Sequence, residues 1–438
     1  MASSSVAITG GHVVPIEGDP IEGGTVLLVD GKIAAVAGPE FKPPPGTDAV
    51  DATGKWVLPG FIDAHAHLGV YEEGEGWAGT DTNELTGPVQ AQVRALDAIN
   101  PAEEGFRDAI SGGVLAVNIN PGSGNPIGGQ TVAVRCWGRT VDDMVLREPA
   151  GLKSALGENP KRVYGDKKET PSTRLGTAAV IRSAFVEASN YLARQEAAKE
   201  KDNQSSERSP VTERDLKLEA LGRVLRREIP WRQHCHRADD IATAMRLAAE
   251  FGYDLVIDHG TEAYLLADKI AAAGIPVVIG PLLTSRSKVE LRNRSLANPG
   301  RLAAAGVTIA LTTDHPVVPV HFLIHQATLA VKEGLDPVTA LRSVTINPAR
   351  IIGVADRLGS LSVGKDADLV IWSGDPLDVM SRAEAAYIGG REIYRYDYAA
   401  RSGVFAAPLP GSRRLGNGRT GPLTRESRRS APDWRLPR

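Results

Sequence analysis

The sequence lacks long apolar runs. None of its stretches approaches the roughly 18 consecutive apolar residues that a membrane-spanning helix needs. Residues 1–5 contain neither the positive charges nor the apolar segment of a secretory signal peptide. Without either mark, we expect a cytoplasmic protein that has no membrane partner.

The sequence also has few cysteines and a small net charge. Cys136 and Cys235 are too few for a disulfide framework, which fits a reducing compartment, and the net charge is only −3. The one strongly charged segment is 412–438, where eight arginines stand against Glu426 and Asp433. This segment has too few apolar residues to fold alone, so we expect 401–438 to be a disordered tail and expect no nucleic-acid partner.

Both ends of the remaining chain have the pattern of β-structure. Residues 5–55 contain short apolar runs separated by turns, and the Asp30-Gly31 pair between two of these runs is typical of a hairpin. The runs 368–372 and 386–388 have the same character. One β domain built from both ends would leave fewer exposed strand edges than two separate sheets.

The middle of the chain alternates between strands and helices. Helical spacing of apolar residues marks segments at 177–199, 213–227, 238–251, 262–273 and 325–333. Eight strand candidates lie between and around them, at 56–67, 113–119, 131–134, 151–156, 231–236, 254–259, 275–280 and 307–314. Eight parallel strands with intervening helices predict an α/β fold of the (β/α)8 TIM-barrel type, whose active site lies at the carboxyl ends of the strands.

The first of these strands ends in two histidines. Its apolar residues lead into Asp63-Ala64-His65-Ala66-His67. Because side chains alternate along a strand, His65 and His67 point the same way and can converge on one metal ion. A pair of polar histidines on a half-exposed edge strand is the less favoured alternative, since the flanking residues resemble a strand buried on both faces.

Three later strands end in further ligand types. These ends are His234-Cys235-His236, Asp258-His259 and Thr312-Thr313-Asp314. Each strand end alone is weak evidence for a metal site. Together they place imidazoles and a carboxylate at one barrel mouth, which suits Zn²⁺ or a similar divalent ion. A thiolate role for Cys235 is less favoured, because alternation turns Cys235 away from the face that His234 uses.

The order of these motifs resembles that of the amidohydrolase superfamily of metal-dependent hydrolases. The matching segments are 59–67, His234, His259, 312–316, Asn347-Pro348-Ala349 and 359–370. The similarity extends over about residues 5–395 and looks closest to the imidazolonepropionase-like branch, which includes dipeptidase-like enzymes. It implies two domains: a small β-sandwich formed by 1–56 together with 359–400, and a barrel formed by 57–358.

The resemblance also implies roles for the candidate residues. His65 and His67 would bind the metal from the first strand, and His234 and His259 from the fifth and sixth. Asp314 would bind metal and accept a proton from the attacking water. His234 is preferred to His236 as ligand because the family's fifth-strand ligand usually opens this segment, which leaves His236 as a catalytic or substrate-contacting group.

The fourth strand departs from a simple match. Many members place a carboxylated lysine there and others a glutamate, and this chain has both Lys153 and Glu158. Their odd separation means that a regular strand cannot point both inward. Glu158, at the end of the strand, is slightly favoured, and the choice between one metal ion and two stays open.

Two loops near the predicted mouth are candidates for substrate contact. The glycine-rich segment 120–130 lacks the Lys-Ser/Thr ending of a phosphate-binding loop, so a substrate-side loop is favoured. The segment 284–288 carries Arg286 and Lys288, which either bind a substrate carboxylate or lie in a solvated loop.

The expected function is hydrolysis of a C–N bond in a small molecule, such as an amide, cyclic amide or dipeptide-like substrate. The alternatives are deamination or decarboxylation on the same metal site, or a scaffold without chemistry. The scaffold is disfavoured because the whole set of four histidines and an aspartate is present. The sequence leaves a homo-oligomer open.

Overall fold

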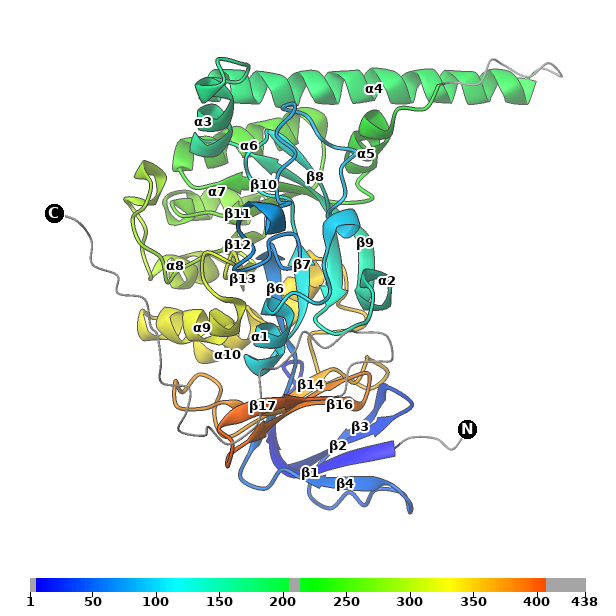
Figure 1. The fold of residues 1–438 in the computed structure, drawn as a ribbon, viewed down its shortest axis with the longest axis vertical. Coiled ribbons are helices and arrows are strands. Elements are labelled where there is room, and N and C mark those ends of the chain that lie inside the picture. The colour runs from blue at the N-terminus through cyan, green and yellow to red at the C-terminus, as the bar shows by residue number, and fades with distance from the viewer. Residues whose placement is uncertain (1–4, 205–212, 407–438) are drawn as a thin grey trace, which may run out of the picture.

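The computed structural model describes residues 5–204 and 213–406, which form two β-sheets with helices around one of them (Figure 1). The larger body, at the centre of Figure 1, contains the barrel sheet, and the second sheet lies below it. The mixed α/β class expected from the sequence is confirmed.

The second sheet takes strands from both chain ends. Its order is β17-β16-β15-β14-β5-β1-β2-β3, with β4 paired to β1. β5 joins the two halves, because it is parallel to β1 and antiparallel to β14. The strands are β1 (Ser5–Val13), β2 (Ile21–Val29), β3 (Lys32–Ala37), β4 (Asp48–Asp51), β5 (Trp56–Pro59), β14 (Leu369–Trp372), β15 (Ala383–Ile388), β16 (Arg391–Asp397) and β17 (Ser402–Phe405).

This sheet continues past residue 400, where we expected the tail to begin. β17 pairs antiparallel with β16, and the Phe405 ring lies 5.2 Å from the Tyr394 ring. These contacts explain why 402–405 is a strand. The rest of the predicted tail, 407–438, lies outside the described residues, and the domain limits stay predictions.

The barrel sheet has eight strands that neighbour one another in chain order. They are β6 (Phe61–Ala66), β7 (Val114–Ile119), β8 (Ile127–Arg135), β9 (Val145–Ala155), β10 (Trp231–Cys235), β11 (Leu255–His259), β12 (Val277–Ile279) and β13 (Ile309–Leu311). Each overlaps a predicted strand, but the run predicted as one strand at 56–67 is divided between β5 of the second sheet and β6, and β8 begins inside the predicted loop 120–130. The interior is lined by small and branched residues, including Ile62, Ala116, Val256, Val278 and Ala310.

The expectation of eight parallel strands is wrong for the third strand. β8 is antiparallel to both β7 and β9. A parallel connection needs a dozen or more residues to cross over, whereas only 120–126 separate β7 from β8. The short connection therefore forces a hairpin.

Helices cover the barrel, and the predicted helical segments are found. The longest, α4, runs along one end of the molecule and extends beyond it in Figure 1. No described helix is long and apolar enough to cross a membrane. The helices are α1 (Gly105–Ser111), α2 (Val141–Met144), α3 (Glu158–Asp166), α4 (Arg174–Gln204), α5 (Leu216–Leu225), α6 (Ala238–Phe251), α7 (Ala267–Ala272), α8 (Asn298–Ala304), α9 (Leu323–Lys332), α10 (Pro337–Arg342) and α11 (Ile346–Ile351), with 3₁₀ turns η1 (Gly76–Gly79), η2 (Ala95–Ala98), η3 (Ala263–Leu266), η4 (Val289–Leu291) and η5 (Val320–Phe322).

The first and last barrel strands are joined by a buried carboxylate. Asp63 accepts hydrogen bonds from the Thr312 hydroxyl (2.6 Å) and from the Thr313 amide (2.9 Å) and hydroxyl (2.6 Å). It also accepts one from the His65 amide (3.0 Å). Asp63 is fully buried, so its oxygens depend on these donors alone.

Replacing Asp63 should weaken the barrel. Asp63→Ala leaves the buried Thr313 amide and hydroxyl without an acceptor, each at a cost of about 1–3 kcal/mol, whereas the Thr312 hydroxyl can still donate to the His65 carbonyl. We expect the free energy of unfolding, measured by urea denaturation, to fall by about 3 kcal/mol or more. Asp19→Ala, at an exposed aspartate, is the control. An Asp63→Ala variant within about 1 kcal/mol of the parent would contradict this role.

Candidate metal centre

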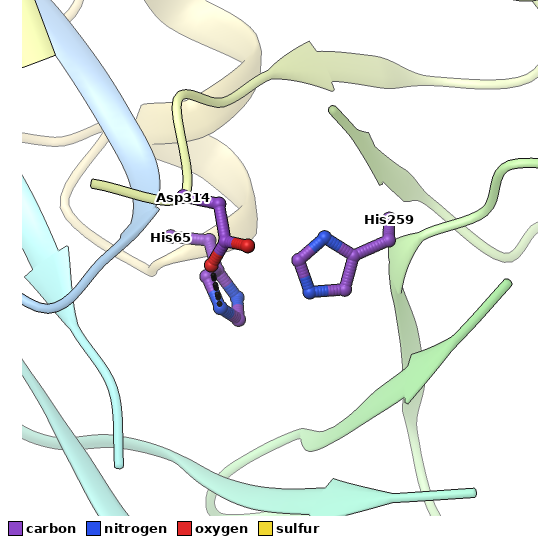
Figure 2. Close-up of side chains that lie close together, drawn as sticks. All are labelled: His65, His259 and Asp314. Carbon is purple, nitrogen blue, oxygen red and sulfur yellow. Dashed lines mark ion pairs between the residues drawn. The ribbon is translucent and has the colours of Figure 1, made fainter. Parts of the chain in front are cut away.

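Three strand ends bring their ligand side chains together at the barrel mouth. Figure 2 shows His65 from β6, His259 from β11 and Asp314 just after β13 pointing toward one another. One ligand atom from each lies within 4.8 Å of those of the other two. His65 and His259 are buried, and Asp314 is 17% exposed.

His67 completes this group. Its Nδ1 is hydrogen-bonded to the Asn120 carbonyl (2.8 Å), so in the neutral ring Nδ1 carries the proton and Nε2 a lone pair. That Nε2 lies 3.3 Å from Asp314 Oδ1, and His65 Nε2 lies 3.5 Å from the same oxygen. Lone pairs that face one another repel, and a cation between them removes the repulsion.

Backbone conformation turns two of these residues inward. Asp258 faces the barrel interior, so alternation would send His259 outward. His259 has φ of +74° and Asp314 of +53°, in the left-handed region that non-glycine residues rarely adopt. His259 Nδ1 donates to the Gly280 carbonyl (2.8 Å), which leaves Nε2 for a ligand. Such conformations cluster at functional sites.

A buried ionic cluster lies beside His65. Lys153 Nζ is 3.0 Å from His65 Nε2 and 3.8 Å from Asp258 Oδ2. Arg232 donates to Asp258 Oδ1 (2.7 Å) and to the Ala64 carbonyl (2.8 Å), and Asp258 Oδ2 lies 3.0 Å from His65 Nδ1. Burial lowers the pKa of Lys153 to about 8, although Asp258 and Asp314 act in the opposite direction. Sequence reasoning missed Arg232 and Asp258.

Glu158 begins a helix and is not at the end of the fourth strand. β9 ends at Ala155 and the chain turns into α3, whose first residue is Glu158. The Glu158 amide donates to Glu290 Oε1 (2.7 Å), but its carboxylate has no hydrogen bond or ion pair within the described residues. Of the two fourth-strand candidates, the structure therefore brings only Lys153 against the histidines.

A second group consists of His234, His236 and Glu290, with ligand atoms again within 4.8 Å of one another. His234 Nδ1, His236 Nε2 and Glu290 Oε2 are buried without a hydrogen-bond partner. Thr261 Oγ1 lies 2.8 Å from His236 Nδ1, and the His234 ring is centred 4.4 Å from that of His259. Glu290 is in η4, after β12, and no sequence pattern indicated it.

The electrostatics suit a divalent ion. Burial lowers the pKa values of His65, His234, His236 and His259, so these imidazoles are neutral and able to act as ligands. Burial alone would raise the pKa of Asp314, but the Coulombic effect of His259 in its protonated form and hydrogen bonding to His67 outweigh burial and hold this pKa below its usual range. Neutral imidazoles and one ionised carboxylate are a donor set that fits Zn²⁺.

Cys235 is turned away, as alternation predicted. Its side chain packs in the hydrophobic core outside the barrel interior, and its Sγ lies 3.6 Å from the Gln233 carbonyl. Burial raises the pKa of this thiol, which keeps it protonated.

Comparisons with known proteins agree with this geometry. The model of the amidohydrolase family matches residues 212–397. The crystal structure of an amidohydrolase from Thermotoga maritima is 47% identical, covers 89% of this chain and 100% of that chain, and superposes with a TM-score of 0.85. The chain belongs to the amidohydrolase family, as the resemblance implied, and the expected class of enzyme, a hydrolase acting on C–N bonds, is confirmed.

Curated relatives are more distant. The imidazolonepropionase of Symbiobacterium thermophilum is 28% identical over 379 residues, which are 81% of this chain and 84% of that protein. Amidohydrolase tasK of Hapsidospora irregularis is 29% identical over 389 residues, 84% of this chain. This chain spans only 39% of the length of tasK.

A pair of variants tests the fourth-strand ligand. Since Lys153 contacts His65 and Glu158 contacts no histidine, Lys153→Ala should lower metal content, whereas Glu158→Ala should leave it nearly unchanged. Arg232 still pairs with Asp258 in Lys153→Ala, so the variant should fold. Metal per chain is measured by plasma mass spectrometry. The opposite pattern would restore Glu158 as the ligand.

Proposed function

We propose that this protein hydrolyses the C–N bond of a small amide or cyclic amide with a divalent metal ion, most simply zinc, held by His65, His67, His259 and Asp314. The convergence of His65, His259 and Asp314 within 4.8 Å carries this proposal. An imidazolone is a cyclic amide, so the imidazolonepropionases among the relatives favour that substrate class. The small number of cysteines supports a cytoplasmic location.

The ion supplies Lewis-acid polarisation of the scissile carbonyl and makes a coordinated water acidic enough to attack near neutral pH. The protein's own residues orient the reactants and move protons. Asp314 is the proton acceptor: it is ionised, lies at the mouth, and its Oδ1 is directed at His65 in β6 and at His67 just after β6.

His234 in β10 and His236 just after β10 face the same space. We assign His234 as a further ligand, because its unpartnered Nδ1 is buried and its ring adjoins His259. His236 keeps its Nδ1 on Thr261, so its Nε2 is the nitrogen available to the substrate or to the leaving group. This assignment makes His236 a catalytic residue.

Lys153 is the fourth-strand group in this proposal, in place of Glu158. A buried amine with a pKa of about 8 is partly neutral at pH 7–8. The neutral amine can add to CO₂ and lose a proton, and the oxygens of the resulting carbamate would help to hold the ion. Bicarbonate or short carboxylic acids should therefore restore part of the metal content and activity of Lys153→Ala.

Metal content tests the centre itself. We expect at least one tightly bound divalent ion per chain by plasma mass spectrometry, loss of turnover on chelation, and recovery with Zn²⁺. His259→Asn should lose metal and activity in parallel, because Nε2 is a ligand. His12→Asn, in β1 of the other sheet, is the control. Full turnover by metal-free protein would refute the metal-dependent mechanism.

Asp314→Asn separates binding from catalysis. Asparagine tolerates the positive φ at this position, and the histidines still hold the ion, so the variant should fold and keep most of its metal. An amide cannot accept the proton, and a placed general base contributes about 10²–10⁴-fold in rate. We expect kcat to fall by that factor on the best substrate of an amide, lactam and dipeptide panel. Turnover within a few-fold of the parent would instead point to His236 as the base.

A further inference from the structure

Lys288 is a cation without a close counter-charge at the mouth of the site. It follows β12 and immediately precedes η4, and its side chain is partly buried. No carboxylate of the described residues lies within the 4.0 Å of an ion pair with its ammonium. Its one hydrogen bond within the described residues goes to Asn159 Oδ1, at 3.4 Å.

Two buried or partly buried cations around the barrel have close carboxylate partners. Arg232 pairs with Asp258 at 2.7 Å, and Arg174 pairs with Asp240 at 3.1 Å and with Glu290 at 2.8 Å. An ammonium taken out of water without a partner is costly. Lys288 has no such carboxylate among the described residues, which indicates that a bound ligand supplies its counter-charge.

The charge of Lys288 acts on the metal centre. Burial lowers its pKa, while the more distant carboxylates of Asp314, Glu290 and Glu158 act in the opposite direction. Its positive charge also helps to keep His234 and His236 neutral. The ammonium thus lies close to the reacting groups, and it disfavours a second cation at the group of His234, His236 and Glu290.

Two other segments position Lys288. Asn159, near the start of α3, accepts from Lys288 through Oδ1 and donates through Nδ2 to Ser123 Oγ (2.8 Å) in the loop after β7. The same Nδ2 lies 3.4 Å from His234 Nε2. Asn159 therefore joins the ammonium to the glycine-rich loop and to the histidines.

Arg286, the other cation of this loop, is directed elsewhere. It is exposed, and its Nε donates to the Arg292 carbonyl (3.1 Å). Of the two candidates in 284–288, only Lys288 has its charge at the mouth.

We propose that Lys288, held by Asn159, binds a carboxylate of the substrate, so that the enzyme acts on amides or cyclic amides that carry a free carboxylate near the scissile bond. This inference rests on the proposed function. A single ammonium without an arginine fork matches one carboxylate better than a doubly charged phosphate.

The test compares carboxylates with their carboxamides. Dipeptides, N-acyl amino acids and lactam carboxylates are assayed beside the same compounds with a carboxamide in place of the carboxylate. The parent enzyme should prefer the acids. Lys288→Met keeps the apolar stem and should reduce kcat/KM for the acids by about 10- to 100-fold, mainly through KM, and for the carboxamides by a smaller factor, because the Lys288 charge also acts on His234 and His236. Lys288→Arg should recover part of the loss, and Arg286→Met should change neither series.

A binding measurement separates this inference from the proposed function. N-acetylglycine and N-acetylglycinamide are titrated into metal-loaded protein by calorimetry. We expect the parent to bind the acid more tightly and Lys288→Met to lose this difference. If that result is obtained while no panel compound is hydrolysed, the carboxylate site stands and the proposed function fails. Equal binding of acid and amide by the parent, no binding of either, or an unchanged preference in Lys288→Met would overturn the inference.

Discussion

The hydrogen bonds of Asp63 determine whether the metal centre can form. The barrel strands neighbour one another from β6 to β13, and no ladder among the described residues pairs these two end strands. Asp63 on β6 joins them by accepting from Thr312 and Thr313. Thr312 and Thr313 directly precede Asp314 in the sequence, and His65 and His67 follow Asp63 by two and four positions. Closing the barrel and bringing these ligands together are therefore one event.

Charge balance inside the barrel explains why these residues tolerate burial. Asp258 is neutralised by Arg232 and lies between Lys153 and His65. This pairing offsets the cost of an isolated buried carboxylate. Burial lowers the pKa of Lys153 beside His65, although Asp258 acts in the opposite direction. The mouth keeps ionised Asp314 and neutral imidazoles, together with Lys288. The polar interior thus holds a charge arrangement that suits the proposed divalent ion and the proposed anionic substrate group.

Local patterns predicted most of the fold and the candidate ligands. Apolar runs marked every barrel strand, and polar residues at their ends marked His65, His67, His234, His259 and Asp314. Periodicity does not report strand direction, so β8 was misassigned, although the short segment 120–126 carried that signal. The positive φ of His259 and the isolated Glu290 have no sequence signature. Arg232, by contrast, is on the same face of β10 as His234, and alternation alone was enough to find it.

The reversal of β8 has a functional consequence. In a regular β/α unit, a helix would follow β7 and remove the chain from the mouth. Here the chain returns at once through the hairpin loop, which keeps Asn120 and Ser123 beside the site. Asn120 fixes the proton of His67 on Nδ1, and Ser123 holds Asn159, which contacts Lys288. The antiparallel strand therefore places a metal-ligand partner and a substrate-side contact on one loop.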